Sequence, residues 1–599
     1  MPKNKNIAIK YTSRDFESIK EDLVQHAKRY YSDGYRDFSE ASFGSMILDT
    51  VAYTGDILSY YLDYHVNESF LDTSLEFENI RKHARALGYK FSGAPSSFGT
   101  ISLFILCPAN TDGTDPDRKY LPILKAGTGF STSDGGSFIL SEDVDFSHSS
   151  ADLVAARFNS STGKTTHFAV RSYGQIQSGV LNLATVDLSN STFERFKKVR
   201  IGAANISEII SVYDSEGNRY YEVDNLSQEV VFVETTNQNA MTDGVRSILK
   251  PFATARRFTL EQDDTGTFLQ FGFGSEDTDN KGITDPSRVA LKMQGKDFIS
   301  QKSFDPSKLI TTNKLGISPS NTELSVVFRS NSPETTNIAA NSINTINNKK
   351  FIFDDITVLT NSQRSFVENS LEVNNDNPIT SINVDISTEE LKQRAKSHYA
   401  TQNRAVTKQD YESLIYNMPP QFGAVTRANI VNDPSSTNRK LSLYVISQDN
   451  NGILAETNMV TKNNIKNWLN QYKSLNDQIE ILNPKIINFK IEFTVMVDKK
   501  FSQDAVLRQC IDALKSLYSD KFYIGEPLYV TRVYDILNRV DGVVDVRKVK
   551  VNNKTGGAYS NITLDMDKIL SKDATFYHTP QNSILELRFP DEDIKGIAK

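Results

Sequence analysis

The sequence contains few residues that bind metals or form covalent cross-links. Its 599 residues include two cysteines, one tryptophan and seven histidines. Cys107 and Cys510 lie far apart and in different expected domains, which argues against a disulfide scaffold and suits a reducing cytosol. Neither a His-x-x-x-His pair nor a Cys-x-x-Cys pair occurs. We therefore expect no metal site and no cofactor.

Long apolar runs are also missing. No stretch of about 18 apolar residues occurs, so we expect no membrane insertion, and the polar N-terminus predicts no secretory signal. The net charge is 67 − 74 = −7, which gives no global case for nucleic-acid binding. Hydrophobic residues are 38% of the chain and charged residues 24%, enough to form buried cores and a soluble surface.

Catalytic motifs are incomplete wherever they begin. The run Gly163–Thr165 suggests a phosphate loop, but Phe158 stands where that loop needs its first glycine. The run 277–282 begins like a calcium loop, but Lys281 cannot bind a cation and Arg288 occupies the closing carboxylate position. Gly135–Ser137 lacks the second glycine of a nucleophile elbow. We therefore predict no catalytic residues and no enzyme.

The chain begins with an expected helical arm, residues 1–92. Ser42 to Phe70 reads as one helix of about 40 Å at 1.5 Å per residue. Apolar cover on more than one face predicts a helix surrounded by neighbours, either this chain's own short helices or helices of other chains. One apolar stripe consists of Ile47, Val51, Leu58 and Leu62, and another on a different side of Tyr53, Ile57, Tyr60 and Tyr64.

Acidic residues dominate this arm. From Tyr35 to Ile80 the formal charge is 1 − 9 = −8. Asp49, Asp56 and Asp63 recur every seven residues and so share one side of the helix. Two interpretations remain open: a solvated face, or docking to a basic partner surface.

At 599 residues the chain is long enough for about four domains. After the arm, short alternating runs rich in Ser, Thr, Asn and Gly predict two β-rich domains over residues 93–385. Helices and strands then alternate, which predicts an α/β domain over 386–548. Residues 549–599 are expected to add C-terminal strands or an arm. The predicted fold class is therefore multidomain α+β.

Two helix starts in the α/β region carry capping signals. Ser387 and Glu390 have the spacing of a capping box, in which the hydroxyl accepts from a free amide and the carboxylate reaches back. Thr407 and Asp410 form a looser version. The single tryptophan, Trp468, falls in the helical run that follows.

Three sets of residues together resemble the baseplate J-like family, the baseplate wedge proteins of contractile-tailed phages. In the second set, Phe273 stands where the family usually has aspartate between two glycines. The three sets are Tyr11–Phe16 with Gly44–Asp49 and Arg85–Tyr89; Leu269–Gly274; and Ala405–Glu412 with Ala424–Val425, Gly525–Leu528 and Val540–Val543.

The resemblance implies a non-catalytic structural subunit of the virion tail baseplate, assembled in the host cytoplasm, with a C-terminal α/β baseplate J-like domain. Family members form homodimers largely through the C-terminal half and join other wedge proteins through N-terminal helices. Neighbouring wedge copies form a ring around the central hub and its hub-proximal or sheath-initiating proteins, and the ring rearranges when the sheath contracts. The resemblance makes Ile47, Val51, Leu58 and Leu62 the expected bundle-facing residues. The acidic row adds Asp49, Asp56 and Asp63 as expected contacts with a basic partner surface.

Two other functions compete with this hypothesis. A tail-associated glycan-degrading enzyme would suit the β-rich centre with its polar loops. Sugar clefts commonly stack on tryptophan, however, and Trp468 stands in a helical run. A host-binding adhesin would predict trimer-forming repeats, and the sequence shows none.

Overall fold

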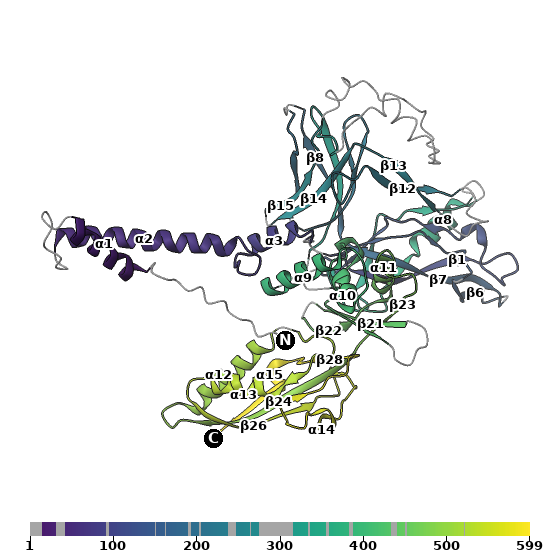
Figure 1. Cartoon of the computed structure of the whole chain (residues 1–599). Coiled ribbons are helices and arrows are strands. Elements are labelled where there is room, and N and C mark those ends of the chain that lie inside the picture. The colour runs from purple at the N-terminus through teal and green to yellow at the C-terminus, as the bar shows by residue number, and fades with distance from the viewer. Residues whose placement is uncertain are drawn as a thin grey trace. The chain divides into compact units, whose positions relative to one another are not determined.

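The computed structural model of the chain forms two compact units (Figure 1). One consists of residues 1–91 together with 386–399, and the other of 92–385 together with 400–599. The structure describes residues 15–30, 42–90, 95–149, 151–161, 163–189, 193–202, 205–237, 247–263, 265–274, 315–332, 336–354, 359–381, 387–432, 440–449, 452–519 and 521–599.

The first unit is helical. The predicted long helix is present as α2, and Ser42 caps it by accepting a hydrogen bond from the Ser45 amide at 3.1 Å. Gly88 lies just after the helix Phe77–Ala86 and has a φ of +87°, a conformation that glycine adopts without strain. The helices of this unit are α1 (Phe16–Tyr30), α2 (Phe43–Glu68), α3 (Phe77–Ala86) and α9 (Thr388–Thr401).

Helix α9 packs against α3, although it is more than 300 residues further along the chain. Leu391 and Ala395 lie four residues apart on one side of α9, and both are fully buried with Ile80 and Ala84 of α3. Lys392 also donates to the Asp72 carbonyl at 3.4 Å. The sequence predicted that this helix begins the 386–548 domain. In the structure, the apolar side of α9 instead completes the core of the helical unit.

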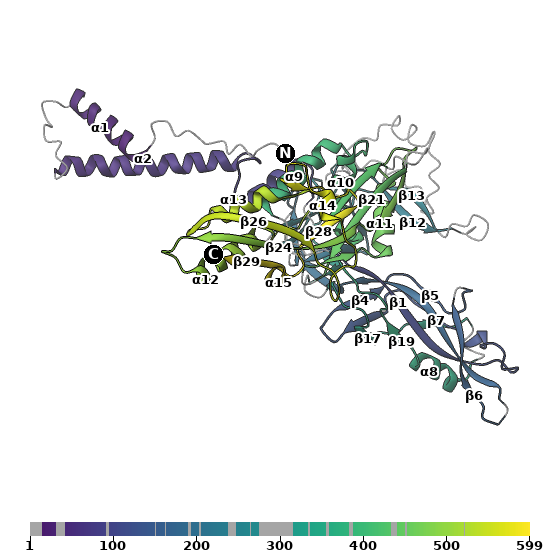
Figure 2. The same ribbon diagram turned by 90° about the horizontal axis from the view of Figure 1, so that it is seen from below.

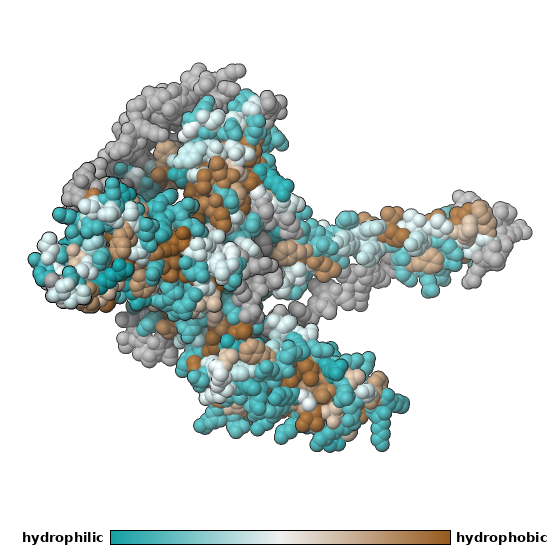
Figure 3. Space-filling model, turned by 180° about the vertical axis from the view of Figure 1, so that it is seen from behind, coloured by the Kyte–Doolittle hydropathy of each residue, from teal (hydrophilic) through white to brown (hydrophobic). Residues whose placement is uncertain are grey.

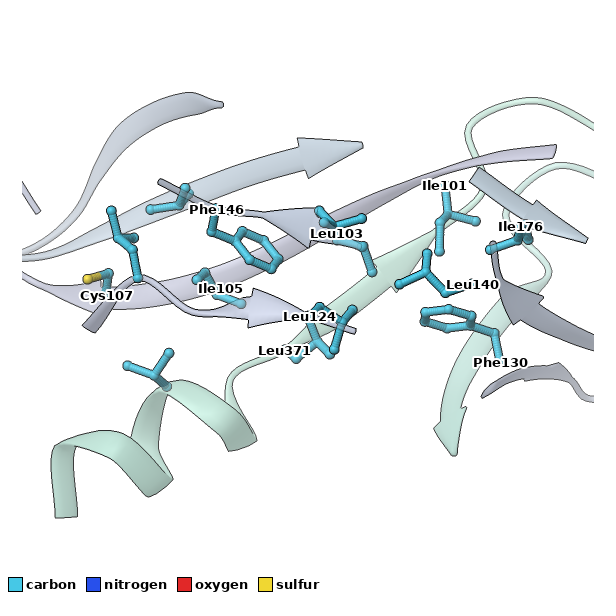
Figure 4. Packing of buried hydrophobic residues seen from close by; sticks show 14 of the residues in the cluster. Ile101, Leu103, Ile105, Cys107, Leu124, Phe130, Leu140, Phe146, Ile176 and Leu371 are labelled. Atoms are coloured by element: carbon cyan, nitrogen blue, oxygen red, sulfur yellow. The ribbon is translucent and has the colours of Figure 1, made fainter. Parts of the chain in front are cut away.

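The second unit begins with a β-domain whose core is shown in Figure 4. Strand β1 (Phe98–Pro108) lies between β7 (Thr165–Ser178) and β19 (Glu372–Asn374) in the main sheet and pairs along its whole length with β7. Ile101, Leu103 and Ile105 alternate into the core, as a strand with one buried face requires. The other elements are η1 (Arg118–Tyr120), β2 (Ile123–Leu124), β3 (Gly129–Thr132), β4 (Ser137–Leu140), β5 (Val144–Asp145), β6 (Asp152–Phe158), β17 (Ile343–Asn347), β18 (Phe351–Ile352) and α8 (Asn361–Asn369).

A second β-domain is inserted into the first. Its main sheet has the order β8-β16-β10-β11-β14-β15-β9, and the chain then returns to pair β17 with β3 and β19 with β1. Two β-domains therefore occupy the middle region, nested rather than consecutive. The inserted strands are β8 (Val180–Asp187), β9 (Lys198–Gly202), β10 (Ile206–Tyr213), β11 (Arg219–Glu222), β12 (Val230–Thr236), β13 (Ser247–Ala253), β14 (Arg257–Asp263), β15 (Gly266–Gln270) and β16 (Glu323–Ser330).

The glycine-rich motif of the sequence lies at the end of β15. A Cβ on Gly272 would come within 2.2 Å of the Gly316 backbone, so only glycine allows this close approach. Phe273 is partly exposed, and the Arg195 guanidinium lies 4.4 Å from its ring centroid. The calcium-loop-like run 277–282 lies outside the described residues.

The next hydrophobic core along the chain is formed by a small group of helices and strands between Lys408 and Leu482. The Thr407–Asp410 capping box is complete, whereas Ser387 accepts from the Glu390 amide and the Glu390 carboxylate instead pairs with Arg394 at 2.7 Å. The looser of the two predicted boxes is thus the complete one. The elements are α10 (Lys408–Tyr416), η4 (Pro420–Phe422), β20 (Arg427–Asn432), β21 (Lys440–Gln448), β22 (Leu454–Glu456), α11 (Met459–Leu469) and β23 (Gln478–Leu482).

The last core is a separate sheet centred on β24 (Lys485–Val497). Strands β26, β28 and β29 all pair with β24, and Figure 2 shows β26 and β29 on either side of it. Residues 549–599 thus supply strands to this sheet, and residue 548 lies inside β26. The other elements are α12 (Gln503–Leu517), β25 (Leu528–Tyr529), α13 (Val530–Asn538), β26 (Val543–Asn553), α14 (Met566–Ile569), β27 (Phe576–Tyr577), β28 (Ser583–Glu586), α15 (Pro590–Asp593) and β29 (Ile594–Ala598).

The two thiols are both free and are buried in different cores. Burial raises the pKa of Cys107 to about 12 and that of Cys510 to about 11. In the part of the chain that the structure describes, no helix is long and apolar enough to cross a membrane. Across the same residues, no group of three or more His, Cys, Asp or Glu side chains is arranged to hold a metal ion.

Candidate interaction surface

Helix α2 exposes an unusual amount of apolar surface. The four residues of the first predicted stripe are between 47% and 62% exposed; we call this set, Ile47, Val51, Leu58 and Leu62, the α2 apolar surface. Figure 3 shows brown apolar side chains along this helical segment, at the right of the view. Large apolar side chains gathered at one exposed place mark an interaction site more often than a solvated face.

The second stripe is also only partly covered. Tyr53 and Tyr60 are exposed, and Tyr60 stacks on Tyr64 with the ring centroids 6.5 Å apart. The Tyr64 hydroxyl donates to Glu76 at 3.2 Å, and burial together with Glu76 raises the pKa of that hydroxyl. The second stripe therefore contains exposed rings together with Tyr64, whose hydroxyl group forms a hydrogen bond within this chain.

The two predicted stripes do not contain all the exposed apolar residues of this region. Some of the others, such as Phe70 and Leu75, lie beyond the end of α2 at Glu68, where helical spacing gives no signal. The further exposed large side chains are Phe43, Met46, Tyr61, Val66, Phe70 and Leu75.

Among the described residues, α1 covers one side of α2. Ala52 is fully buried, and a Cβ on Gly55 would lie 3.3 Å from Ile19 of α1. Asp49 lies on this side and forms an ion pair with Lys20 at 2.7 Å. Asp49, one member of the predicted acidic row, thus forms an ion pair within this chain. The other two members, Asp56 and Asp63, are half-buried.

Glu68 ties the end of α2 to α3. Its buried carboxylate accepts hydrogen bonds from the Leu75 amide at 2.8 Å and from the Asn79 side chain at 2.8 Å. Burial raises the pKa of Glu68, but these hydrogen bonds outweigh burial, so the pKa lies below the ordinary 4.5. The connection between the two helices therefore depends on an ionised carboxylate.

Glu68→Gln is expected to lower the free energy of unfolding of the helical unit by about 1–3 kcal/mol, since an amide cannot accept at both positions. The folded pKa is below 4.5, so the stabilisation is complete above about pH 4.5 and is lost as pH falls through the folded value. Urea unfolding followed by far-ultraviolet circular dichroism measures both effects. Exposed Glu21→Gln is the control, and an equal loss in both variants would contradict this role.

A model of a known protein family matches the N-terminal part of the chain. Residues 15–86 match the family described as "Bacteriophage baseplate protein, N-terminal domain". This range contains α1, α2 and α3, and so the whole α2 apolar surface. The chain therefore carries a baseplate N-terminal domain, which supports a structural role in a phage tail baseplate. No curated protein sequence matches the chain.

The solved structures that are distantly similar to the chain include two baseplate assemblies. One is the six-fold symmetrised cryo-EM structure of the anti-feeding prophage baseplate, at 12% identity over 94% of this chain and 90% of that chain, with a TM-score of 0.26. The other is the TssK-TssF-TssG baseplate subcomplex of the type VI secretion system, at 9% identity over 74% of this chain and 96% of that chain, with a TM-score of 0.25. At these TM-scores neither structure defines the arrangement of this chain.

Proposed function

We propose that this protein is a structural subunit of the baseplate wedge, joined to other wedge proteins through the α2 apolar surface. The observation that carries the proposal is the exposure of Ile47, Val51, Leu58 and Leu62 within a baseplate N-terminal domain. The subunit forms a homodimer, links neighbouring wedges into a ring around the central hub, and rearranges when the sheath contracts. It carries out no catalysis.

Burial of this surface supplies part of the free energy that association needs. Each of its four side chains is about half exposed, and full burial of such a side chain contributes about 1.5–3 kcal/mol. Covering the remaining halves therefore contributes roughly 3–6 kcal/mol before the entropy of association is subtracted. The tyrosine stripe on another side of α2 adds further area, so partner helices on two sides are favoured over one.

The rival glycan-degrading function gains no support from the single tryptophan. The Trp468 indole donates to the Leu414 carbonyl at 2.8 Å, and its ring lies 4.9 Å from the Tyr472 ring. Trp468 packs against the core that includes Leu414 and Ile465. A side chain held in this way is part of the α10–α11 packing rather than a platform for a sugar.

Light scattering on the purified full chain tests the homodimer. We expect twice the mass of one chain, unchanged by dilution over the accessible concentrations and unchanged in a variant of the α2 apolar surface, because the family resemblance puts the dimer contact in the C-terminal half. A monomer at every concentration would contradict self-association of the isolated chain. A dimer that dissociates when the α2 apolar surface is changed would show that the dimer contact lies in the helical arm.

A further inference from the structure

The C-terminal sheet has one covered and one open face. On the covered face, Phe493 and Val495 of β24 pack with Val506 of α12 and Val533 of α13. The alternate residues of β24, Lys490 to Met496, point the other way and are only half-buried. Strand register then places the facing side chains of β26 and β29 on the same open side.

Basic residues dominate this open face. Lys548 lies opposite Thr494, while Lys550 and Lys595 lie opposite Glu492 from the two neighbouring strands. Arg547, at a bulge in β26, reaches the Met496 sulfur at 3.3 Å. We call the set Lys490, Arg547, Lys548, Lys550 and Lys595 the basic sheet face. With Glu492 and Asp545 as the acids on this side, its formal charge is 5 − 2 = +3.

This charge is concentrated around one carboxylate. Lys490 forms an ion pair with Glu492 at 2.7 Å. The Lys490 hydrogen bond, with Lys550 and Lys595 nearby, lowers the pKa of Glu492 below its ordinary value of 4.5. One acid is therefore shared among three lysines, and Lys548 and Arg547 lie further along the same face. A positive surface results on a protein whose net charge is −7.

The pattern of charge restricts what can cover this face. A second copy of the same face would bring like charges together, which disfavours a two-fold contact here. The face has Met496, Thr494 and exposed Ile597 between its lysines, and no aromatic ring among these residues for a base to stack on. Glu492 at its centre repels phosphates. Carboxylates of a protein suit this arrangement better than a nucleic acid.

The size of the face indicates one contact among several. Three strands about 4.8 Å apart and seven residues long at about 3.4 Å each cover roughly 300 Å². A stable interface needs about 800 Å² per partner. The basic sheet face would thus steer and register a neighbour rather than hold it alone, and its contribution would weaken with salt.

We propose that the basic sheet face docks a carboxylate-rich surface of another protein subunit. This deepens the proposed structural role, on which it rests, by naming a second contact surface that is separate from the α2 apolar surface. Acidic side chains of the partner would lie between Lys548, Lys550 and Lys595, with apolar contact at Met496 and Ile597.

Binding of fluorescein-labelled poly-L-glutamate to the full chain, followed by anisotropy at low and physiological salt, tests the proposal. Lys548→Glu with Lys550→Glu is expected to weaken binding at least about 10-fold, because two attractive contacts become repulsive. Arg118→Glu with Lys119→Glu changes the net charge equally at an exposed basic pair elsewhere, and should weaken binding less than about two-fold.

Lysine acylation with mass-spectrometric readout locates the contact without any substitution. Bound poly-L-glutamate should protect Lys548, Lys550 and Lys595 and leave Lys119 reactive. Equal weakening by both variant pairs, or no protection of the three lysines, would overturn the proposal. Tighter binding of duplex DNA with the same dependence on Lys548 and Lys550 would reassign the face to nucleic acid. The mass of the variant by light scattering tests the dimer separately, and we expect it to be unchanged.

Discussion

Leu58→Glu together with Leu62→Glu is expected to weaken association with the wedge partner at least about 100-fold. Both side chains lie in the α2 apolar surface and are more than half exposed. Central apolar residues of an interface cost about 2 kcal/mol or more each when lost, and glutamate adds the cost of burying a charge. The measurement is co-purification of the full chain with co-expressed baseplate subunits of the same tail, quantified against the unchanged chain.

A matched substitution controls for this effect. Leu475→Glu makes the same type of change once, adding one of the two negative charges of the double variant, at a leucine that is fully exposed outside the helical unit. It should leave both co-purification and stability unchanged within about 0.5 kcal/mol. The helix content of the double variant should also be unchanged, since neither leucine is buried. If the folded Leu58→Glu, Leu62→Glu chain co-purified as well as the unchanged chain, α2 would not be part of the interface.

Phe489→Ala is expected to lower the free energy of unfolding of the C-terminal sheet by about 3–5 kcal/mol, the cost of a large cavity in a packed core. Phe489 is fully buried in β24, with the Tyr518 and Phe522 rings 6.1 and 5.8 Å away. Urea unfolding monitored by circular dichroism measures the loss. The proposed homodimer should weaken with it, because that contact is assigned to the C-terminal half.

An exposed residue of the same sheet serves as the comparison. Ile597→Ala removes apolar atoms from β29 on the open face, where the side chain is more than half exposed. We expect a change within about 0.5 kcal/mol. A loss of the same size in both variants would mean that Phe489 does not form the centre of this core.

Local signals in the sequence predicted much of the secondary structure. The apolar stripes predicted α2 because helical spacing depends on neighbouring residues only. Alternation in a strand also fixes which side chains share a face, as for Val445 in β21 and Val497 in β24, which are both buried. The multidomain α+β class and the baseplate assignment are confirmed at the same coarse level.

Long-range pairing could not be predicted in this way. Leu391 and Ala395 gave the apolar side of a helix, but nothing local shows that Ile80 and Ala84 cover it. The insertion of β8 to β16 within the first β-domain likewise depends on β19 returning to β1. The interface residues stay predictions for the same reason, because their partner is not encoded in this chain.

The central claim is that foreign helices cover the α2 apolar surface in the assembled baseplate. Cryo-EM of the full chain in complex with co-expressed baseplate subunits tests this most directly. We predict a partner helix packed against Ile47, Val51, Leu58 and Leu62, with a second neighbour on the tyrosine stripe. An assembled wedge in which these four side chains stay open to solvent would contradict the account.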